Sequence, residues 1–465
     1  MPTDAAGHAG HGRAIPAAEA ELLRATAGAR PAESSSPAPV PALASGQRTR
    51  AGTELSVLRS RGRMRGAAAL LGPAFVAAIA YVDPGNFATN FSAGAASGYR
   101  LAWVIVAADL MAMLVQYLSA KVGVATGRDL PELCREHLPR GVVLGLWAQA
   151  ELVAMATDVA EFVGAAVGLN LLFGTPLPIA GLITAVVATG ILALDQRGYR
   201  RFELAIMALL GLVLLGFGYD LVAVHPSAAG LAHGLVPGFG GSDGLLLAVG
   251  IIGATVMPHV VYLHSALTKD RVTCRDDAER RALLRFQRAD VLIALGAAGL
   301  VNLAMLTVGA ALFRTAGRHA AVSDWIEAAH ADLGRLVGGG AALTFAVALL
   351  ASGLSSSSVG TYAGQVVMRG FLGRGVPLFV RRGLTMLPAL IVLTAGLPPT
   401  ASLVLSQVVL SFGIPFALVP LVALTRRADV MGTLVNSRLT TGAAAATAGL
   451  IIALNGYLLW ITLAH

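Results

Sequence analysis

Apolar residues are grouped into long segments that follow one another from about residue 67 to the end of this 465-residue chain. A segment of roughly 20 apolar residues is long enough to cross a bilayer as an α-helix. Short loops that carry most of the charged residues separate these segments. The pattern therefore predicts an all-α protein with eleven transmembrane helices, at approximately 67–91, 100–123, 142–173, 177–194, 202–224, 244–268, 289–313, 337–368, 378–396, 400–424 and 440–464.

Composition supports a polytopic membrane protein. Hydrophobic residues make up 56% of the chain and charged residues 13%, whereas soluble domains carry about 25% charged residues. The net charge of +8 does not indicate a nucleic-acid partner, because the basic residues collect in alternate loops. Basic loops stay on the cytoplasmic side, so we expect a cytoplasmic N-terminus and an extracytoplasmic C-terminus in the cell (inner) membrane. The opposite loops hold only Arg100, Arg314, Arg318 and Arg335.

The N-terminal part has a different composition. Residues 1–65 are rich in Ala, Pro, Gly and Ser and contain no apolar core of a signal peptide. We expect a disordered cytoplasmic tail there, followed by one transmembrane domain over 66–465. Cys134 and Cys274 both fall in loops assigned to the cytoplasm, where a disulfide is not expected.

The first apolar segment is interrupted by Asp83-Pro84-Gly85-Asn86. Proline removes a backbone donor and clashes with the preceding turn, and glycine lets the chain leave helical geometry. An aspartate at mid-membrane costs about 3 kcal/mol on insertion scales. Such a break is tolerated where it faces protein or water, which favours a discontinuous helix that builds a binding site. The alternative is a kinked helix with one buried, neutralised aspartate.

The sixth segment contains a second interruption, Gly253-Ala254-Thr255-Val256-Met257-Pro258-His259. The first and sixth segments are five crossings apart, so they run through the bilayer in opposite directions. Paired interrupted helices in two antiparallel halves are typical of inverted-repeat transporters and lie at the substrate site. We therefore predict inverted five-helix repeats at approximately 66–224 and 244–424, followed by an extra helix at 440–464.

The two breaks offer the ligands of a metal ion. Asp83 supplies an anionic oxygen, Asn86 a neutral oxygen and Met257 a thioether. The carbonyls of Ala80 and Ala254 precede the prolines and are expected to be freed by the unwound backbone. A thioether selects softer transition ions over Ca²⁺ and Mg²⁺, which prefer oxygen ligands only. The alternative for Met257 is plain core packing.

The third segment carries three acidic residues. Asp158 and Glu161 are three residues apart and share one helix face, and Glu151 lies close to the same face. Acids inside the membrane are expensive unless they pair or titrate, and proton relays use such chains. The alternative is a static network of salt bridges. His259 lies beside the second break. An unperturbed histidine has a pKa of about 6.5, so we assign His259 to proton movement or to tuning of the metal site.

The paired motifs Asp-Pro-Gly-Asn and Met-Pro-His resemble the signature of the Nramp family of proton-coupled divalent metal transporters. The stretches Ala80–Asn90 and Gly253–His259 look like those of bacterial manganese transporters, and the resemblance covers roughly residues 66–465. It implies a leucine-transporter-like fold and a transporter rather than an enzyme. It also implies proton-coupled import of Mn²⁺, Fe²⁺ and similar ions, Cd²⁺ included, by alternating access, with no permanently bound cofactor.

The same resemblance assigns residues to the proton route. By position, Asp158 and Glu161 look like the third-helix proton pathway, and Glu151 would end the route near the cytoplasm. The basic residues that alternate with these acids in the family correspond to Arg271, Arg381 and Arg382.

One further position resembles a family ligand. Gln407 in the tenth segment matches the residue that joins the metal site in an outward-closed state. Its alternative role is a hydrogen bond between helices. Asp109 also lies inside a membrane segment, and we assign it no role beyond a polar contact.

The sequence disfavours several functions other than metal import. A sodium-coupled amino-acid or amine carrier of the same fold is disfavoured by Asp83 beside Met257, and a magnesium-selective relative should lack the thioether. A zinc-dependent intramembrane hydrolase needs a His-Glu-x-x-His motif, and the sequence has none. A metal sensor is disfavoured by the short C-terminus. Saturable uptake would distinguish a carrier from a channel. The expected partners are divalent metal ions, protons and the lipid bilayer, and the oligomeric state is left open.

Overall fold

The computed structural model describes residues 53–54, 72–194, 199–269, 271–316, 325–375 and 377–464. The chain divides into two units, Met1–Ser45 and Gly46–His465, and every described residue belongs to the second. The expected disordered tail therefore lies outside the described residues, except for a short strand. This strand, β1 (Thr53–Glu54), pairs in parallel with β2 (Val272–Thr273).

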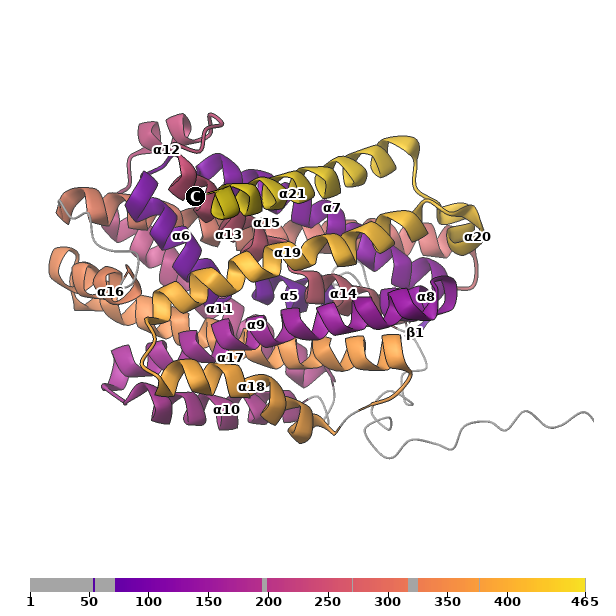
Figure 1. The fold of residues 1–465 in the computed structure, drawn as a ribbon, viewed down its shortest axis with the longest axis horizontal. Helices are drawn as coiled ribbons and strands as arrows, with labels where there is room; N and C mark the ends of the chain where they lie inside the picture. The colour runs from indigo at the N-terminus through magenta and orange to yellow at the C-terminus, as the bar shows by residue number, and fades with distance from the viewer. Residues whose placement is uncertain are drawn as a thin grey trace, which may run out of the picture. The chain divides into compact units, whose positions relative to one another are not determined.

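Each of the eleven apolar segments forms one helix or two half-helices (Figure 1). Among the described residues, eight helices are long and apolar enough to cross a membrane by length and composition. The first segment comprises α5 (Pro73–Ala78), the 3₁₀ helix η1 (Ile79–Val82) and α6 (Pro84–Ser97), and the sixth comprises α13 (Ser242–Thr255) and α14 (Pro258–Lys269). The others form α7 (Ala102–Thr126), α9 (Arg140–Phe173), α10 (Leu177–Ala193), α11 (Tyr199–Val224), α15 (Asp277–Ala316), α17 (Gly339–Leu372), α18 (Leu378–Thr394), α19 (Pro399–Thr425) and α21 (Arg438–Ala464).

Short helices occupy the loops, where the apolar pattern predicted no element. They are α8 (Leu130–His137), α12 (Ala228–Gly234), α16 (Trp325–Leu336), α20 (Ala428–Met431) and the 3₁₀ helix η4 (Gly432–Leu434). Figure 1 shows α8 and α20 at one end of the helical bundle and α12 and α16 at the other. This separation agrees with the prediction that successive loops lie alternately on the two sides of the membrane. We call the end that carries α8, α20 and β2 the basic end.

Both predicted breaks are present, and local backbone chemistry explains them. Asp83 is extended (φ −76°, ψ 168°) and caps α6, because its Oδ1 accepts the Asn86 backbone N–H at 2.8 Å. Pro84 then occupies the first helical position, where its missing N–H costs nothing. In the second break Val256 leaves helical geometry (φ −102°, ψ 75°), and Pro258 starts α14.

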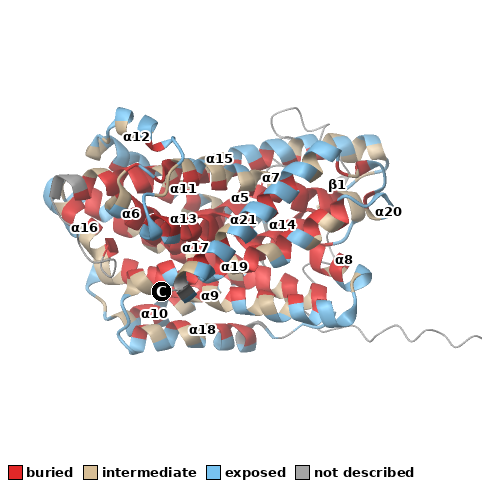
Figure 2. Cartoon of the chain, turned by 45° about the horizontal axis from the view of Figure 1, so that its top comes forward, coloured by how far each residue is buried: buried red, intermediate tan, exposed pale blue. Residues whose placement is uncertain are grey.

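The broken helices are surrounded by other helices. The most apolar 18-residue window of Ser242–Lys269 is 94% buried, the highest share among the eight candidate spans. Helix α9 packs against α17 and α19 on one side of the breaks, and α7 and α15 pack against each other and against the half-helices on the other. Figure 2 shows the resulting buried interior around α13, α14 and α5. The breaks therefore face protein rather than lipid, as the cost of a lipid-exposed aspartate requires.

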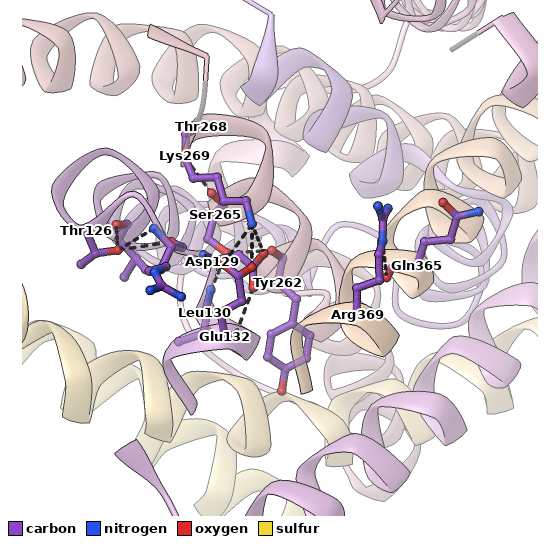
Figure 3. Close-up of polar contacts among 12 residues, drawn as sticks. Thr126, Asp129, Leu130, Glu132, Tyr262, Ser265, Thr268, Lys269, Gln365 and Arg369 are labelled. Atoms are coloured by element: carbon purple, nitrogen blue, oxygen red, sulfur yellow. Dashed lines mark hydrogen bonds and ion pairs between the residues drawn. The ribbon is translucent and has the colours of Figure 1, made fainter. Parts of the chain in front are cut away.

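A charged cluster ties α8 to the end of α14 (Figure 3). Asp129 and Glu132 form a capping box at the start of α8, so each side chain accepts the other residue's backbone N–H. The Lys269 ammonium lies 2.7 Å from Asp129 and 2.9 Å from Glu132. Ser265 of α14 also accepts the Leu130 backbone N–H at 3.0 Å. These contacts fix the basic end of the second half-helix to the loop between α7 and α9.

Candidate metal site

Asp83 is fully buried at the first break and keeps coordinating capacity. Its Oδ1 accepts the Asn86 backbone N–H and the Gly85 backbone N–H lies near the carboxylate, whereas the Gln407 amide nitrogen makes a long contact of 3.4 Å with Oδ2. A carboxylate has about four acceptor positions on its two oxygens. A cation at this point would therefore find a largely unengaged carboxylate oxygen.

Asn86 presents its amide oxygen in the same region. Its Nδ2 donates to the Tyr81 carbonyl at 2.5 Å and to Asn302 Oδ1 at 3.1 Å. The opposite amide atom, Oδ1, is buried and has no hydrogen-bond partner in the described part of the chain. Gln407 Oε1 is buried without a partner in the same way. Since buried polar atoms are nearly always satisfied, these two acceptors beside Asp83 fit a bound cation.

Gln407 lies between the two breaks. A Cβ added at Gly85 would come within 1.7 Å of Gln407 Nε2, and one added at Gly253 would come within 2.0 Å of the Gln407 carbonyl oxygen. The two glycines thus allow α19 to approach the start of α6 and the end of α13. The structure therefore brings Gln407, the residue predicted from the tenth segment, close to both interrupted helices.

The remaining predicted ligands also lie in the interior. Met257 is fully buried between α13 and α14, and Ala80 and Ala254 are each 1% exposed. A proline follows each alanine by four residues, so the helical N–H that would normally bond to each alanine carbonyl is missing. The described residues contain no group of three or more His, Cys, Asp or Glu side chains that could hold a metal ion. A site here consequently depends on one carboxylate together with amide, carbonyl and thioether donors.

The candidate ligands are closed off from solvent. Asp83, Asn86, Met257 and Gln407 each have 0% exposed surface. An ion could reach them from either side only after the surrounding residues move. This conformation is therefore closed towards both ends of the bundle.

Helix α9 contacts both breaks. A Cβ on Gly164 would come within 2.0 Å of Pro84 Cβ, and Thr157 Oγ1 lies 3.4 Å from His259 Nδ1. His259 Nε2 is buried and has no partner among the described residues. The helix that carries the predicted acids is thus packed directly against the metal-site candidates.

The acids of α9 form a sequence of charged groups that leads away from Asp83. Glu161 is 1% exposed and lies in electrostatic range of Asp83 and Asp158. Its two carboxylate oxygens have no hydrogen-bond partner within the described ranges. Asp158 in turn interacts electrostatically with Arg382 and Arg381.

Arginines of α18 continue this sequence towards the basic end. Arg381 pairs with Glu151 at 2.9 Å, which joins two residues expected on the proton route. The Arg382 guanidinium donates to Thr361 and Ser357 at 2.9 and 3.1 Å. Both arginines are buried, and their helix packs against α9.

Arg271 takes a different position from the other two arginines. It pairs with Glu203 of α11 at 3.1 Å, beside the start of α5. Asp290 lies in the same region and accepts the backbone N–H groups of Gly72 and Ala74 at 3.2 and 3.0 Å. These contacts hold the N-terminal end of the first half-helix at the basic end.

Nothing in the sequence indicated two residues that orient the site, Asn302 and Thr157. Asn302 Oδ1 accepts from Asn86 and Asn90, and Asn302 Nδ2 donates to the Tyr81 carbonyl at 2.9 Å. The available signal was weak, since each is a single neutral polar residue inside an apolar segment.

Asp109 lies between α7 and α15, in electrostatic range of Tyr81 beside the first break. A Cβ on Gly299 would come within 2.4 Å of Asp109 Oδ2, and Asp109 Oδ1 is buried without a partner in the described chain. This position gives Asp109 no contact with the candidate ligands discussed above.

Comparison with known proteins places the chain in a family. The family model described as "Natural resistance-associated macrophage protein-like" (Nramp) matches residues 74–461. The chain belongs to the Nramp family. The divalent metal cation transporter MntH of Deinococcus radiodurans is 53% identical over 390 residues, which cover 84% of this chain and 89% of that protein.

Solved structures confirm the fold. An Eremococcus coleocola manganese transporter superposes with a TM-score of 0.76 and 32% identity, covering 85% of this chain and 87% of that one. MhsT in complex with L-phenylalanine superposes with a TM-score of 0.57 and 13% identity over 83% and 97% of the two chains, which shows the fold alone. The predicted Nramp membership and leucine-transporter-like fold are confirmed. This Nramp protein is a multi-pass membrane protein whose relatives are named as transporters, not enzymes.

Proposed function

We propose that this chain imports divalent transition-metal ions, Mn²⁺ and Fe²⁺ foremost and Cd²⁺ as well, across the cytoplasmic membrane together with protons. The observation that carries the proposal is the Asp83 carboxylate beside two buried, unpartnered acceptors, Asn86 Oδ1 and Gln407 Oε1. The names of the relatives, a divalent metal cation transporter and a manganese transporter, support the same class of substrate.

The donor set explains the choice of metal. One carboxylate, neutral oxygens and the Met257 thioether form a site of low charge with one soft ligand. Mg²⁺ holds its water shell tightly and prefers oxygen, so a dehydrated site with sulfur disfavours it. Mn²⁺, Fe²⁺ and Cd²⁺ tolerate this mixture better.

Protons would leave the site along α9. A ligating carboxylate must be deprotonated, so metal binding at Asp83 releases a proton or prevents its return. Glu161 lies in electrostatic range of Asp83, and Asp158, Arg382 and the Arg381–Glu151 pair follow towards the basic end. His259, whose Nε2 is unpartnered, would tune or assist this transfer. An inward proton gradient would then drive uptake.

The candidate ligands are closed off from both ends of the bundle, so transport would require each end to open in turn, as in alternating access. The half-helices α5 and α14 both reach the basic end, where Asp290 and Lys269 hold them through hydrogen bonds and ion pairs. Release of these contacts would open a route from the site to that end. With the basic end in the cytoplasm, the direction of transport is import.

Replacing Asp83 by asparagine tests the site. We expect uptake of Mn²⁺ into proteoliposomes, driven by an inward pH gradient, to fall at least tenfold, because the only carboxylate among the proposed ligands is lost. Asp220→Asn is the matched control, since Asp220 is also buried in a membrane helix but accepts a hydrogen bond from Thr344, away from the site. Uptake by Asp83→Asn equal to that of the control would refute the assignment.

Replacing Met257 by alanine tests the role of sulfur in selectivity. We expect Mg²⁺ and Ca²⁺ to compete with Mn²⁺ more strongly in Met257→Ala, since the soft ligand is removed. Met431→Ala serves as the control for the loss of a buried methionine, because Met431 is 3% exposed and lies in α20. An unchanged competition profile in Met257→Ala would assign this side chain to packing alone.

A further inference from the structure

A polar pocket of about 290 Å³ opens at the basic end, away from the metal site. Residues of α7, α15 and the η4 segment line it, among them Tyr117, Leu434 and Thr433. Four basic residues contribute most of its charge: Lys121, Arg281, Arg285 and Arg288. Neither the transport mechanism nor the predicted proton route uses any of them.

Lys121 is the most buried of the four basic residues of this pocket, and no acid in the described part of the chain pairs with it. Lys121 is only 7% exposed, and its Nζ donates a hydrogen bond to Asn436 Oδ1 at 2.8 Å. An ammonium has three donors, and buried charges are normally paired with an opposite charge. No acidic side chain pairs with Lys121 within the described ranges. The pocket thus contains a buried cation that no acid of the described ranges pairs with.

Three arginines of α15 surround the mouth of the pocket. Arg281, Arg285 and Arg288 are four and three residues apart, so they share one helix face, and all three are exposed. None forms an ion pair with a described residue, whereas Arg280 pairs with Asp277 at 3.2 Å. Asp277 lies one turn before Arg281 on the same helix face, and it also accepts a hydrogen bond from Thr433 at 2.7 Å. Asp277 lies in electrostatic range of Arg281, so it offsets part of this charge, but three exposed arginines share the face and leave an excess of positive charge.

The same face of α15 continues into an apolar, exposed surface. Leu292 follows Arg288 by four residues, and it is 49% exposed on a helix long and apolar enough to cross the membrane. An anion bound by the arginines would thus lie at the boundary between the polar loops and the lipid-facing surface. Phospholipids place a phosphate and an acyl chain across such a boundary.

We propose that the basic pocket binds the headgroup of an anionic phospholipid. Lys121, which Asn436 Oδ1 holds in place, contacts the phosphate inside the pocket. Arg285 and Arg288 contact it at the mouth, and an acyl chain follows α15 past Leu292. Basic pockets between membrane helices recognise anionic headgroups in this way, and each basic residue strengthens binding about fivefold. The bound lipid connects α7 and α15 to the segment between α19 and α21.

The test measures lipid binding by the purified, delipidated full chain in detergent. Mixed micelles containing phosphatidylglycerol or cardiolipin are titrated, and the thermal unfolding midpoint gives an apparent affinity. We expect stabilisation by the anionic lipids, little by phosphatidylcholine, and little by inorganic phosphate or glycerol phosphate. Equal stabilisation by phosphatidylcholine would overturn the proposal. Equal stabilisation by the soluble phosphates would identify a soluble anion as the ligand and overturn it too.

Variants locate the binding site. Arg285→Gln with Arg288→Gln should weaken apparent binding of the anionic lipid at least tenfold. Lys121→Met should weaken it severalfold while removing an unpaired buried charge. The matched control is Arg374→Gln with Arg426→Gln, which removes two exposed arginines from loops outside the pocket and should change binding less than twofold. If the two double variants weaken binding equally, the lipid is attracted by net charge rather than held at this pocket, and the site is refuted.

Discussion

At the scale of single residues, glycines determine how closely the ligand candidates approach one another. Gly85 and Gly253 leave space that the Gln407 side chain and backbone fill. Asn302 orients Asn86 by accepting from its amide nitrogen, which leaves the amide oxygen of Asn86 available. The candidate metal site thus depends on the two glycines, which have no side chain, as much as on the ligand side chains.

A methyl group at Gly85 should displace Gln407 from Asp83. We expect Gly85→Ala to weaken Mn²⁺ binding about tenfold, or about 1.4 kcal/mol, because the new Cβ would lie 1.7 Å from Gln407 Nε2. Isothermal titration of the purified protein measures this affinity.

The control is a helical glycine with open space around it. Gly190→Ala in α10 meets no atom within 4 Å and should leave Mn²⁺ affinity unchanged. Its effect on folding stability should stay within about 1 kcal/mol. Unchanged affinity in Gly85→Ala would remove Gln407 from the site.

At the scale of elements, capping interactions hold the half-helices at the basic end. The Lys269 ammonium joins α14 to the capping box of α8 (Figure 3). Burial raises the pKa of Asp129 to about 6, although Lys269 and the backbone N–H of Glu132 oppose this shift. Ionising Asp129 therefore costs desolvation energy that its ion pair and hydrogen bonds only partly offset.

This shift makes the stability contribution of Asp129 depend on pH. Its folded pKa of about 6 exceeds the ordinary value of 3.8, so the folded protein binds the proton more tightly. The contribution is most favourable below pH 3.8 and is lost as pH rises towards 6. The upper limit is about 3 kcal/mol, from a difference of about 2 between the pKa values.

Thermal unfolding of Asp129→Asn against the wild type checks this sign. Between pH 4 and pH 6 the wild type should lose stability relative to the variant, because asparagine keeps the cap without titrating. Glu136→Gln, which removes an exposed partner of Arg128, provides the control. A wild type that gains stability over the variant in this range would contradict the prediction.

At the scale of the whole molecule, the basic loops gather at one end of the bundle. Helices α8 and α20 lie there, and α12 and α16 lie at the opposite end (Figure 1). Cys274 is at the basic end and half-buried, and Cys134 is buried. Native cysteine chemistry can therefore report which end faces the cytoplasm.

Labelling of Cys274 should require permeabilised cells. A membrane-impermeant maleimide should modify the protein only after permeabilisation, because the positive-inside bias places the basic end in the cytoplasm. Burial raises the pKa of the Cys274 thiol, so labelling is best performed near pH ~8.5. Cys274→Ser should abolish the signal. Labelling of intact cells would reverse the proposed orientation.

The sequence by itself determined the features that depend on neighbouring residues. Apolar length predicted the helices, and proline with glycine predicted the breaks at Asp83 and Met257, because both effects act within one or two turns of backbone. The acids of α9 were equally visible, since a charge in an apolar segment is conspicuous without any structure. The paired motifs also identified the family.

The tertiary structure decided which of these residues meet. Asn302 lies more than 200 positions from Asn86 and orients it, and Arg271 pairs with Glu203 beside the start of α5. That no acid of the described ranges pairs with Lys121 became visible only once its surroundings were known. Such contacts depend on helix packing between distant segments, and no local pattern in the chain encodes them.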